Sequence, residues 1–257
     1  MTATPTGAIY PDLADKTVIV TGGGSGIGEA IVRRFAAQGA KTAFIDIKDS
    51  ESRALADELV AQGHRVHFEQ ADLTDIAALR TAIDNIRGKF GSLQILINNA
   101  AHDERHAALD VTPDYWDDRI AVNLKHQFFA AQAVLPDMIA AKAGSIINFG
   151  STSWMVGQGG MAAYTAAKSG VLGLTRSLAR DFGQYNIRVN AIAPGWIMTQ
   201  RQIDLWLNAE AEAELMKRQC LKRKLVPDEI ARATLFFASD EASACTNQQY
   251  VVDGGWV

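Results

Sequence analysis

Short apolar runs recur along the chain and alternate with longer amphipathic stretches. The runs expected to form strands are Thr17–Val20, Thr42–Ile45, Arg65–Phe68, Gln94–Ile97, Ser145–Phe149, Ile187–Ala191 and Gln249–Val252. The stretches between them are helix-like in their pattern of apolar residues. This alternation predicts an α/β fold: a Rossmann-like, doubly wound parallel sheet of seven strands with helices on both faces.

The central strands should be buried on both faces. Val18–Val20 and Ile95–Ile97 are apolar without alternation, as expected of parallel strands that are covered on both sides. Right-handed crossovers distribute the connecting helices over the two faces. Ligands of such sheets bind at the carboxyl ends of the strands, so the candidate site is expected there.

The pattern predicts a single domain over residues 1–257, because no linker, repeat or low-complexity tract interrupts it. Residues 1–14 are expected to form a loosely held N-terminal arm. Residues 198–225 are the one long insertion in the alternation. Their helical composition beside the ligand edge predicts a substrate-binding lid.

Charge and composition narrow the partners. A net charge of -4 argues against nucleic acid and anionic membrane surfaces, so a small-molecule partner is expected. The N-terminal residues do not resemble a secretory signal, and no apolar run has membrane-spanning length, which predicts a cytoplasmic protein. Cys220 and Cys245 are expected to be thiols, and no metal site is expected.

A glycine-rich turn, Thr21–Gly28, follows the first strand and opens an amphipathic helix. Backbone N–H groups at a helix N-terminus can face a pyrophosphate, and glycines permit its close approach. The spacing differs from the commoner Gly-x-Gly-x-x-Gly, and a turn needed only for packing is the alternative. The strand and helix around the turn favour dinucleotide binding, through Gly22, Gly24, Ser25, Gly26, Ile27 and Gly28.

Asp46 ends the second strand, where a carboxylate can accept both hydrogen bonds of an adenosine ribose diol. The same charge would repel a 2′-phosphate, so NAD is predicted in preference to NADP. Asp46 could instead cap the next helix, although Asp49 or Ser50 could do that. Further adenosine contacts are expected from Ile47, Asp72 and Leu73. Asp72 is equally consistent with a helix cap.

Tyr164 and Lys168 stand four residues apart, which places them on one face of a helix. Positive charge lowers the pKa of a tyrosine. Lys168 and a positive nicotinamide ring would together bring the phenol closer to working pH as a base. Alone, Tyr-x-x-x-Lys is typical of ordinary helices that pair a half-buried Tyr with a surface Lys.

Several motifs in one order decide between these interpretations. They are Thr21–Gly28, Asn98–Ala100, Asn123, Ser151, Tyr164 with Lys168, and Pro194–Gly195. From about Asp15 to the C-terminus the chain resembles the short-chain dehydrogenase/reductase family. The resemblance implies an NAD-dependent enzyme that acts on CH–OH groups.

The resemblance also implies roles for single residues. Ser151 would hydrogen-bond the reacting oxygen, with Ser153 a weaker candidate, and Asn123 would hold a water that links Lys168 to solvent. Without the family, Ser151 would be a loop hydroxyl and Asn123 a locally bonded polar residue. The catalytic set is therefore Asn123, Ser151, Tyr164 and Lys168.

Further cofactor contacts follow from the same resemblance: Asn99, Ala100 and Ala101 after the fourth strand, and Pro194, Gly195, Ile197 and Thr199 after the sixth. By itself, Pro194–Gly195 merely marks a turn. Ala101 departs from the family, since many members have Gly there. The extra methyl group requires a backbone conformation allowed to L-residues, and its effect on NAD binding should be small.

Within the family, the chain resembles bacterial aldose 1-dehydrogenases of the D-xylose type. The similar segments lie outside the cofactor machinery: Ala8–Pro11, Asp103–His106, Gln219–Leu221 and Asp253–Trp256. Tyr164 would deprotonate the anomeric hydroxyl, and hydride transfer to NAD would leave a lactone. The pocket for this polyhydroxylated substrate is expected to include His102, Ser151, Ser153, Trp154, Gln158, Tyr164, Trp196, Arg201 and Gln202.

Two other functions stay open at this point. One is oxidation of a secondary alcohol on a 2-keto-3-deoxy sugar acid or another hydroxy acid, with Arg201 binding the carboxylate. The other is a non-catalytic, NAD-responsive binding protein, which would not need Ser, Tyr, Lys and Asn together. Family members form dimers or tetramers, and the apolar Phe128–Phe129 and Val171–Leu174 suit buried contact, so a homotetramer is expected.

Overall fold

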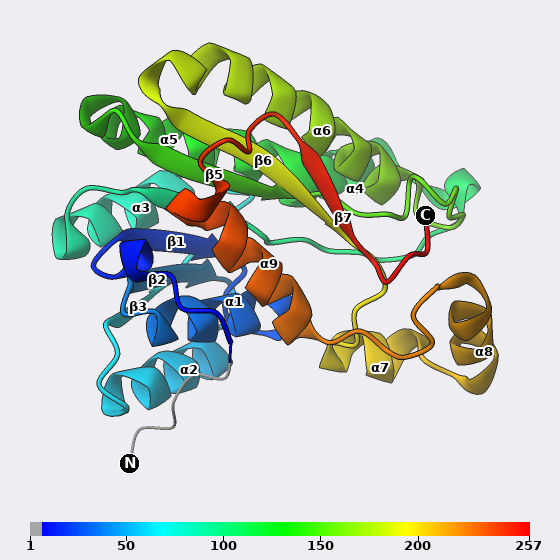
Figure 1. Ribbon diagram of the computed structural model, residues 1–257. Helices are drawn as coiled ribbons and strands as arrows, with labels where there is room; N and C mark the ends of the chain where they lie inside the picture. The colour runs from blue at the N-terminus through cyan, green and yellow to red at the C-terminus, as the bar shows by residue number, and fades with distance from the viewer. Residues whose placement is uncertain (1–6) are drawn as a thin grey trace.

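The strands form one parallel sheet in this computed structural model, which describes residues 7–257 (Figure 1). Their order is β3-β2-β1-β4-β5-β6-β7. Their bounds are β1 Thr17–Thr21, β2 Lys41–Asp46, β3 Val66–Gln70, β4 Ile95–Asn98, β5 Gly144–Phe149, β6 Ile187–Pro194 and β7 Gln249–Val252. The predicted seven-stranded, doubly wound sheet is confirmed.

Helices connect the strands and cover both faces of the sheet. Their bounds are α1 Gly26–Ala37, α2 Asp49–Ala61, α3 Ile76–Phe90, α4 Pro113–Ile120, α5 His126–Ala141, α6 Ala162–Phe182, α7 Gln200–Trp206, α8 Ala209–Arg218 and α9 Pro227–Ala238. One core packs the sheet against α1, α2 and α9, and the other packs it against α3, α5 and α6. Figure 1 shows the two groups on opposite sides of the sheet.

Strand β1 shows why the apolar runs do not alternate. Val18 and Val20 belong to the core under α1 and α9, whereas Ile19 belongs to the core under α3 and α5. All three side chains are completely buried. Alternate residues therefore enter opposite cores, as a parallel sheet covered on both faces requires.

The carboxyl ends of the strands meet at one edge of the sheet. The strand order reverses at β1, which pairs with β2 on one side and with β4 on the other. Strand β6 runs past the predicted Ala191 to Pro194, because its last residues pair with β7. Ligands of open parallel sheets bind at this edge and next to such a reversal.

Residues 7–14 pack against the fold. Leu13 is completely buried within the 3₁₀-helix Pro11–Leu13. The backbone N–H of Tyr10 donates to Oε1 of Gln38 at 2.7 Å, and Nε2 of Gln38 donates to the carbonyl of Ala8 at 3.1 Å. The expected loose arm therefore does not extend to residues 8–14. Residues 1–6 lie outside the part of the chain described.

The segment between β6 and α9 leaves the layered body and forms α7 and α8 at one end of the molecule (Figure 1). Its ends are joined, because Met198 donates its backbone N–H to the carbonyl of Leu225 at 2.9 Å. Thr199 and Asn208 each cap a helix by accepting a backbone N–H with the side chain. Residues 198–225 thus form a helical excursion whose two ends are joined, and its role as a lid stays a prediction.

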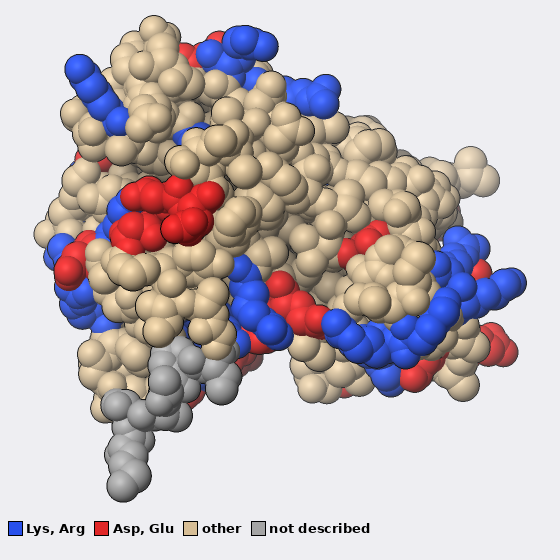
Figure 2. Space-filling model, viewed as in Figure 1, with Lys and Arg blue, Asp and Glu red and all other residues tan. Residues whose placement is uncertain are grey.

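Basic side chains gather over α8 and its connection to α9, at the lower right of Figure 2. Three of the basic residues in this region, Arg218, Arg223 and Lys224, form ion pairs with glutamates. Part of this local positive charge is therefore balanced by neighbouring carboxylates.

Within residues 7–257, no helix combines the length and the hydropathy that crossing a bilayer requires. Cys220 and Cys245 are both free thiols. In the same residues, no cluster of three His, Cys, Asp or Glu side chains has the geometry of a metal site.

Candidate active site

A cavity of about 490 Å³ lies at the carboxyl ends of β4, β5 and β6. Its walls come from the segments after these strands, from α6, and from α7 and α8. The predicted residues that line it are Ile27, Asn99, Ala101, Ser151, Ser153, Gln158, Tyr164, Lys168, Pro194, Gly195, Trp196, Ile197, Thr199 and Gln202. The cavity thus gathers the predicted catalytic side chains with one part of the predicted cofactor contacts.

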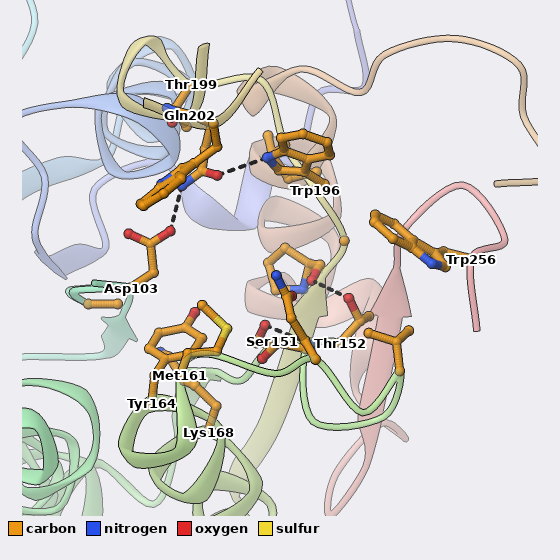
Figure 3. Close-up of a pocket in the computed structure, with 18 of the residues that line it drawn as sticks. Asp103, Ser151, Thr152, Met161, Tyr164, Lys168, Trp196, Thr199, Gln202 and Trp256 are labelled. Atoms are coloured by element: carbon orange, nitrogen blue, oxygen red, sulfur yellow. Dashed lines mark hydrogen bonds between the residues drawn. The ribbon is translucent and has the colours of Figure 1, made fainter. Parts of the chain in front are cut away.

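Helix α6 brings Tyr164 and Lys168 to the cavity. Tyr164 lies in its first turn, and Lys168 follows on the same face with Nζ 5.7 Å from the centre of the phenol ring. Ser151, two residues after β5, lines the same cavity and acts to lower the pKa of Tyr164. Three of the four predicted catalytic residues therefore meet at one wall (Figure 3).

The ammonium group of Lys168 is buried, with 1% of the residue exposed. Nζ donates to the carbonyl of Phe149, the last residue of β5, at 2.7 Å. Burial lowers the pKa of Lys168 to about 7, and the negative charge of Asp103 opposes that shift. At neutral pH this side chain can therefore either hold or release a proton.

The pKa of Tyr164 is shifted upward, because burial disfavours the phenolate and the charge of Asp103 adds to the effect. The neighbouring hydroxyl of Ser151 acts in the opposite direction. The sequence predicted a lowered pKa from Lys168 and the nicotinamide ring together. Without the cofactor, the protein does not lower the pKa of Tyr164, because the effect of burial is larger than that of Ser151.

Asn123 sits in a π-helix, Ala121–Lys125, between α4 and α5. It is completely buried, and its Oδ1 accepts the backbone N–H of His102 at 2.9 Å while its Nδ2 donates to the carbonyl of His102 at 3.1 Å. Single π-helical turns often occur at functional sites. Here the turn lets Asn123 hold the backbone that follows β4.

The glycine turn between β1 and α1 is closely packed. Gly22 and Gly26 adopt positive φ angles of 66° and 59°, which side chains disfavour. A Cβ on Gly28 would lie 1.8 Å from the carbonyl oxygen of Gly22. Asn99 fixes the turn from β4, donating Nδ2 to the same carbonyl at 2.9 Å. The glycines are therefore required by the packing of the turn, and pyrophosphate binding at the start of α1 stays a prediction.

Asp46 is a buried carboxylate beside this turn. Its Oδ2 accepts the backbone N–H of Gly24 at 2.9 Å, and its Oδ1 accepts that of Lys48 at 3.0 Å. Its side chain does not cap α2, which argues against the alternative that Asp46 is only a helix cap. Each oxygen keeps lone-pair capacity for a ribose hydroxyl.

The other predicted adenosine contacts lie outside the cavity lining. Ile47 is 62% exposed at the end of β2, whereas Leu73 is buried in the core under α3. Asp72 accepts hydrogen bonds from the backbone and the hydroxyl of Thr74. The cap of α3 is instead Asp75. Asp72 therefore serves a local turn.

The predicted substrate residues divide into two groups. Ser153, Gln158, Trp196 and Gln202 line the cavity with Ser151 and Tyr164, whereas His102, Trp154 and Arg201 do not. The His102 ring contacts Arg119, and its pKa is lowered by burial and by that arginine. Arg201 donates Nε to Oδ1 of Asp103 at 3.1 Å. Arg201 is therefore already paired with a carboxylate of this chain.

A chain of hydrogen bonds joins the segment after β4 to helix α7. Nε2 of Gln202 donates to Oδ2 of Asp103 at 2.6 Å, and Oε1 of Gln202 accepts from Nε1 of Trp196 at 2.8 Å. Figure 3 shows the Asp103 carboxylate and the Gln202 amide pointing toward one another. A second contact places the Arg105 guanidinium 4.0 Å from the centre of a Trp206 ring.

Several cavity residues were not predicted. They are Asp103, Arg105, Phe149, Gly150, Thr152, Val156, Met161, Leu205, Trp206, Asn208, Ala211, Glu214, Leu215 and Trp256. Asp103 and Trp256 stand in segments that carry the resemblance to aldose dehydrogenases, which was the available signal. The residues of α7 and α8 lie within the predicted lid, but the sequence did not single them out, because only the packing of the excursion turns particular faces inward.

Comparisons with known proteins agree over nearly the whole chain. Residues 22–257 match a family model described as enoyl-(acyl carrier protein) reductase. The chain is 50% identical over 247 residues to "Probable galactose dehydrogenase GalD" of Rhizobium meliloti (strain 1021), covering 96% of each. It is 45% identical over 249 residues to D-xylose 1-dehydrogenase of Caulobacter vibrioides (strain NA1000 / CB15N), covering 97% of this chain and 98% of that relative. The crystal structure of gox2181 matches with a TM-score of 0.91 and 31% identity, over 96% of this chain and 98% of that one.

The burial of Lys168 predicts a pH-dependent stability. In the unfolded chain its ammonium stays charged up to about pH 10.5, whereas in the folded chain it loses its proton near pH 7. Between these two pH values the unfolded state therefore binds more protons than the folded state. The free energy of unfolding should therefore rise by up to about 2 kcal/mol from pH 7 to pH 9 through this group. Urea denaturation of wild type and Lys168→Met measures it. An equal rise in both proteins would contradict the assignment.

Proposed function

The chain belongs to the short-chain dehydrogenase/reductase family, and we propose that it oxidises an aldose at C1 to the lactone with NAD. The observation that carries this proposal is one cavity that combines Ser151, Tyr164 and Lys168 with polar and aromatic walls. Relatives named galactose dehydrogenase and D-xylose 1-dehydrogenase support the sugar. A polyhydroxylated ligand needs that mixture of hydrogen-bonding groups and flat apolar faces.

In the proposed mechanism, Tyr164 takes the proton of the anomeric hydroxyl. Ser151 donates a hydrogen bond to the same oxygen and stabilises the carbonyl that develops there. A bound NAD would supply the hydride acceptor for C1 and a positively charged ring. Lys168 holds a proton next to Tyr164, and its near-neutral pKa lets it pass that proton on.

The cofactor would lie from the glycine turn to the cavity. Gly22, Gly26 and the first turn of α1 would face the pyrophosphate, and Asp46 would accept the ribose hydroxyls. Pro194 and Thr199, which line the cavity, would border the nicotinamide. Asn123 would hold the water that carries protons from Lys168 to solvent, while its amide keeps the segment after β4 in place.

The excursion of α7 and α8 would act as the lid of this site. It contributes Gln202, Leu205, Trp206 and Leu215 to the cavity wall, and its contacts with Asp103 and Arg105 would hold it closed over a bound sugar. Closing such a segment excludes water from the reacting atoms.

We also infer a homotetramer and a cytoplasmic location. Two apolar side chains are partly exposed: Phe128 on α5, at 40%, and Val251 on the edge strand β7, at 41%. Both lie where subunit contacts are expected in this family. A reducing cytoplasm would keep Cys220 and Cys245 as the free thiols that the structure has.

The position of Arg201 does not favour the alternative substrate, a sugar acid. That alternative required Arg201 to bind a substrate carboxylate, but Arg201 lies outside the cavity lining and pairs with Asp103. The aldose therefore remains the proposed substrate.

Tyr164→Phe tests the mechanism. We expect turnover of aldoses, followed as NADH absorbance over a panel of pentoses, hexoses and 6-deoxy sugars, to fall by about 10²–10⁴-fold because the proton acceptor is lost. Binding of NAD should be retained. Tyr185→Phe, which removes the same hydroxyl in a short 3₁₀-helix outside the cavity lining, is the matched control. Undiminished turnover in Tyr164→Phe would refute the mechanism, and wild-type silence on every sugar with NAD bound would refute the substrate.

Asp46→Asn tests the choice of cofactor. Wild type should bind NAD at least about 10-fold more tightly than NADP, and the variant should narrow that ratio by about 10-fold, since the repelling charge is gone. Titration calorimetry with both cofactors gives the ratio. Glu51→Gln, an exposed acid in the first turn of α2, serves as the charge control. A wild type that prefers NADP would overturn the role of Asp46.

A further inference from the structure

Asp103 places a carboxylate at the wall of the catalytic cavity. It follows β4 on the segment whose backbone Asn123 holds at the preceding residue, His102. Its side chain is 23% exposed. In the described chain the cavity wall has one other acidic residue, Glu214, which pairs with Arg218 on α8. Asp103 differs because it lies near the reacting groups.

The position of this carboxylate is fixed from the lid side. One oxygen accepts from Gln202 and the other from Arg201, both on α7. Gln202 is held in turn by the indole of Trp196. A carboxylate offers about four acceptor positions, so both oxygens keep capacity for another donor. The group is therefore oriented without being saturated.

The charge of Asp103 reaches the catalytic pair. Burial raises the pKa of Tyr164 and lowers that of Lys168, and the charge of Asp103 shifts both pKa values upward, so the phenol and the ammonium both lie within its field. A substrate whose hydroxyl meets Tyr164 must therefore lie close to a fixed negative charge. An anionic substrate would be repelled there, whereas a neutral polyol would not.

The cations around the cavity offset the charge of Asp103 only in part. Lys168 donates to the carbonyl of Phe149, and the Arg105 guanidinium lies over the ring of Trp206. Arg201 pairs with Asp103, but it does so from outside the lining and with 45% of its side chain exposed, so solvent screens the pair. The arrangement lacks the bidentate arginine that usually recognises a carboxylate, at least among the residues described.

We propose that Asp103 is the residue that selects uncharged sugars: its carboxylate accepts hydrogen bonds from substrate hydroxyls, and its charge excludes sugar acids. This inference rests on the proposed function and specifies its substrate class. It assigns Asp103 direct contact with the sugar, beyond its bond to α7.

Asp103→Asn tests the proposal with little change in shape, since the amide can still accept from Gln202. For the aldose that wild type turns over fastest, kcat/KM should fall by about 10-fold or more, mainly through KM, because an acceptor is lost. Binding of the matching aldonate to the enzyme–NAD complex, measured by calorimetry, should tighten by about 10-fold. Asp110→Asn, an exposed acid of the same segment outside the cavity lining, should change neither quantity.

The ratio of aldose to aldonate affinity separates the outcomes. If wild type binds aldonate as tightly as aldose, or if Asp103→Asn leaves the ratio unchanged, the selection role is refuted. A third outcome is that wild type turns over no sugar and does not bind aldonate, while Asp103→Asn does bind aldonate. That result would refute the proposed reaction and support the selection by charge. Should Asp103→Asn not fold, Asp103→Ser is measured in its place. Asp103→Glu, which keeps the charge, should still exclude aldonate.

Discussion

The buried ammonium group of Lys168 is the interaction on which the site depends. A charge in this position is costly to bury unless it is hydrogen-bonded, and the carbonyl of Phe149 at the end of β5 supplies the bond. That bond sets Lys168 against the central strand and thereby sets Tyr164, one helical turn earlier, at the cavity wall. The pKa of Lys168, lowered to about 7, is the electrostatic consequence of the same burial. Position and proton affinity therefore have one cause.

The two sides of the cavity are connected through the segment after β4. Asn123, held in the π-helix before α5, binds the backbone of His102 on one side. Asp103, the next residue, binds Gln202 of α7 on the other. The catalytic wall is thus formed by the sheet and α6, while the opposite wall is an excursion that reaches Asp103 and Arg105 through side-chain contacts. This arrangement suits a site that must admit a sugar and then exclude water.

The fold could be predicted because each local pattern agrees with the final structure. The apolar runs at Val18–Val20 and Ile95–Ile97 match β1 and β4, and the glycine turn opens α1 as expected. The spacing of Tyr164 and Lys168 was weak evidence alone, and it became decisive only with Ser151 and Asn123 in register.

What could not be predicted depends on packing between distant segments. Arg201 looked like an anion-binding residue, but α7 turns it toward Asp103, almost a hundred positions earlier in the chain. The raised pKa of Tyr164 follows from desolvation by walls that the sequence does not specify. Leu13 is buried because it packs into the core under α1, although the sequence predicted a loosely held arm there.

In the proposed reaction, hydride leaves C1 of an aldose. The most direct measurement is the mass of the reduced cofactor after turnover of an aldose that carries deuterium at C1. The account predicts that the cofactor gains one deuterium and that the lactone forms in equal amount, with a slower rate if hydride transfer limits turnover. Turnover that leaves the deuterium on the sugar would show that another hydroxyl is oxidised and would contradict the account.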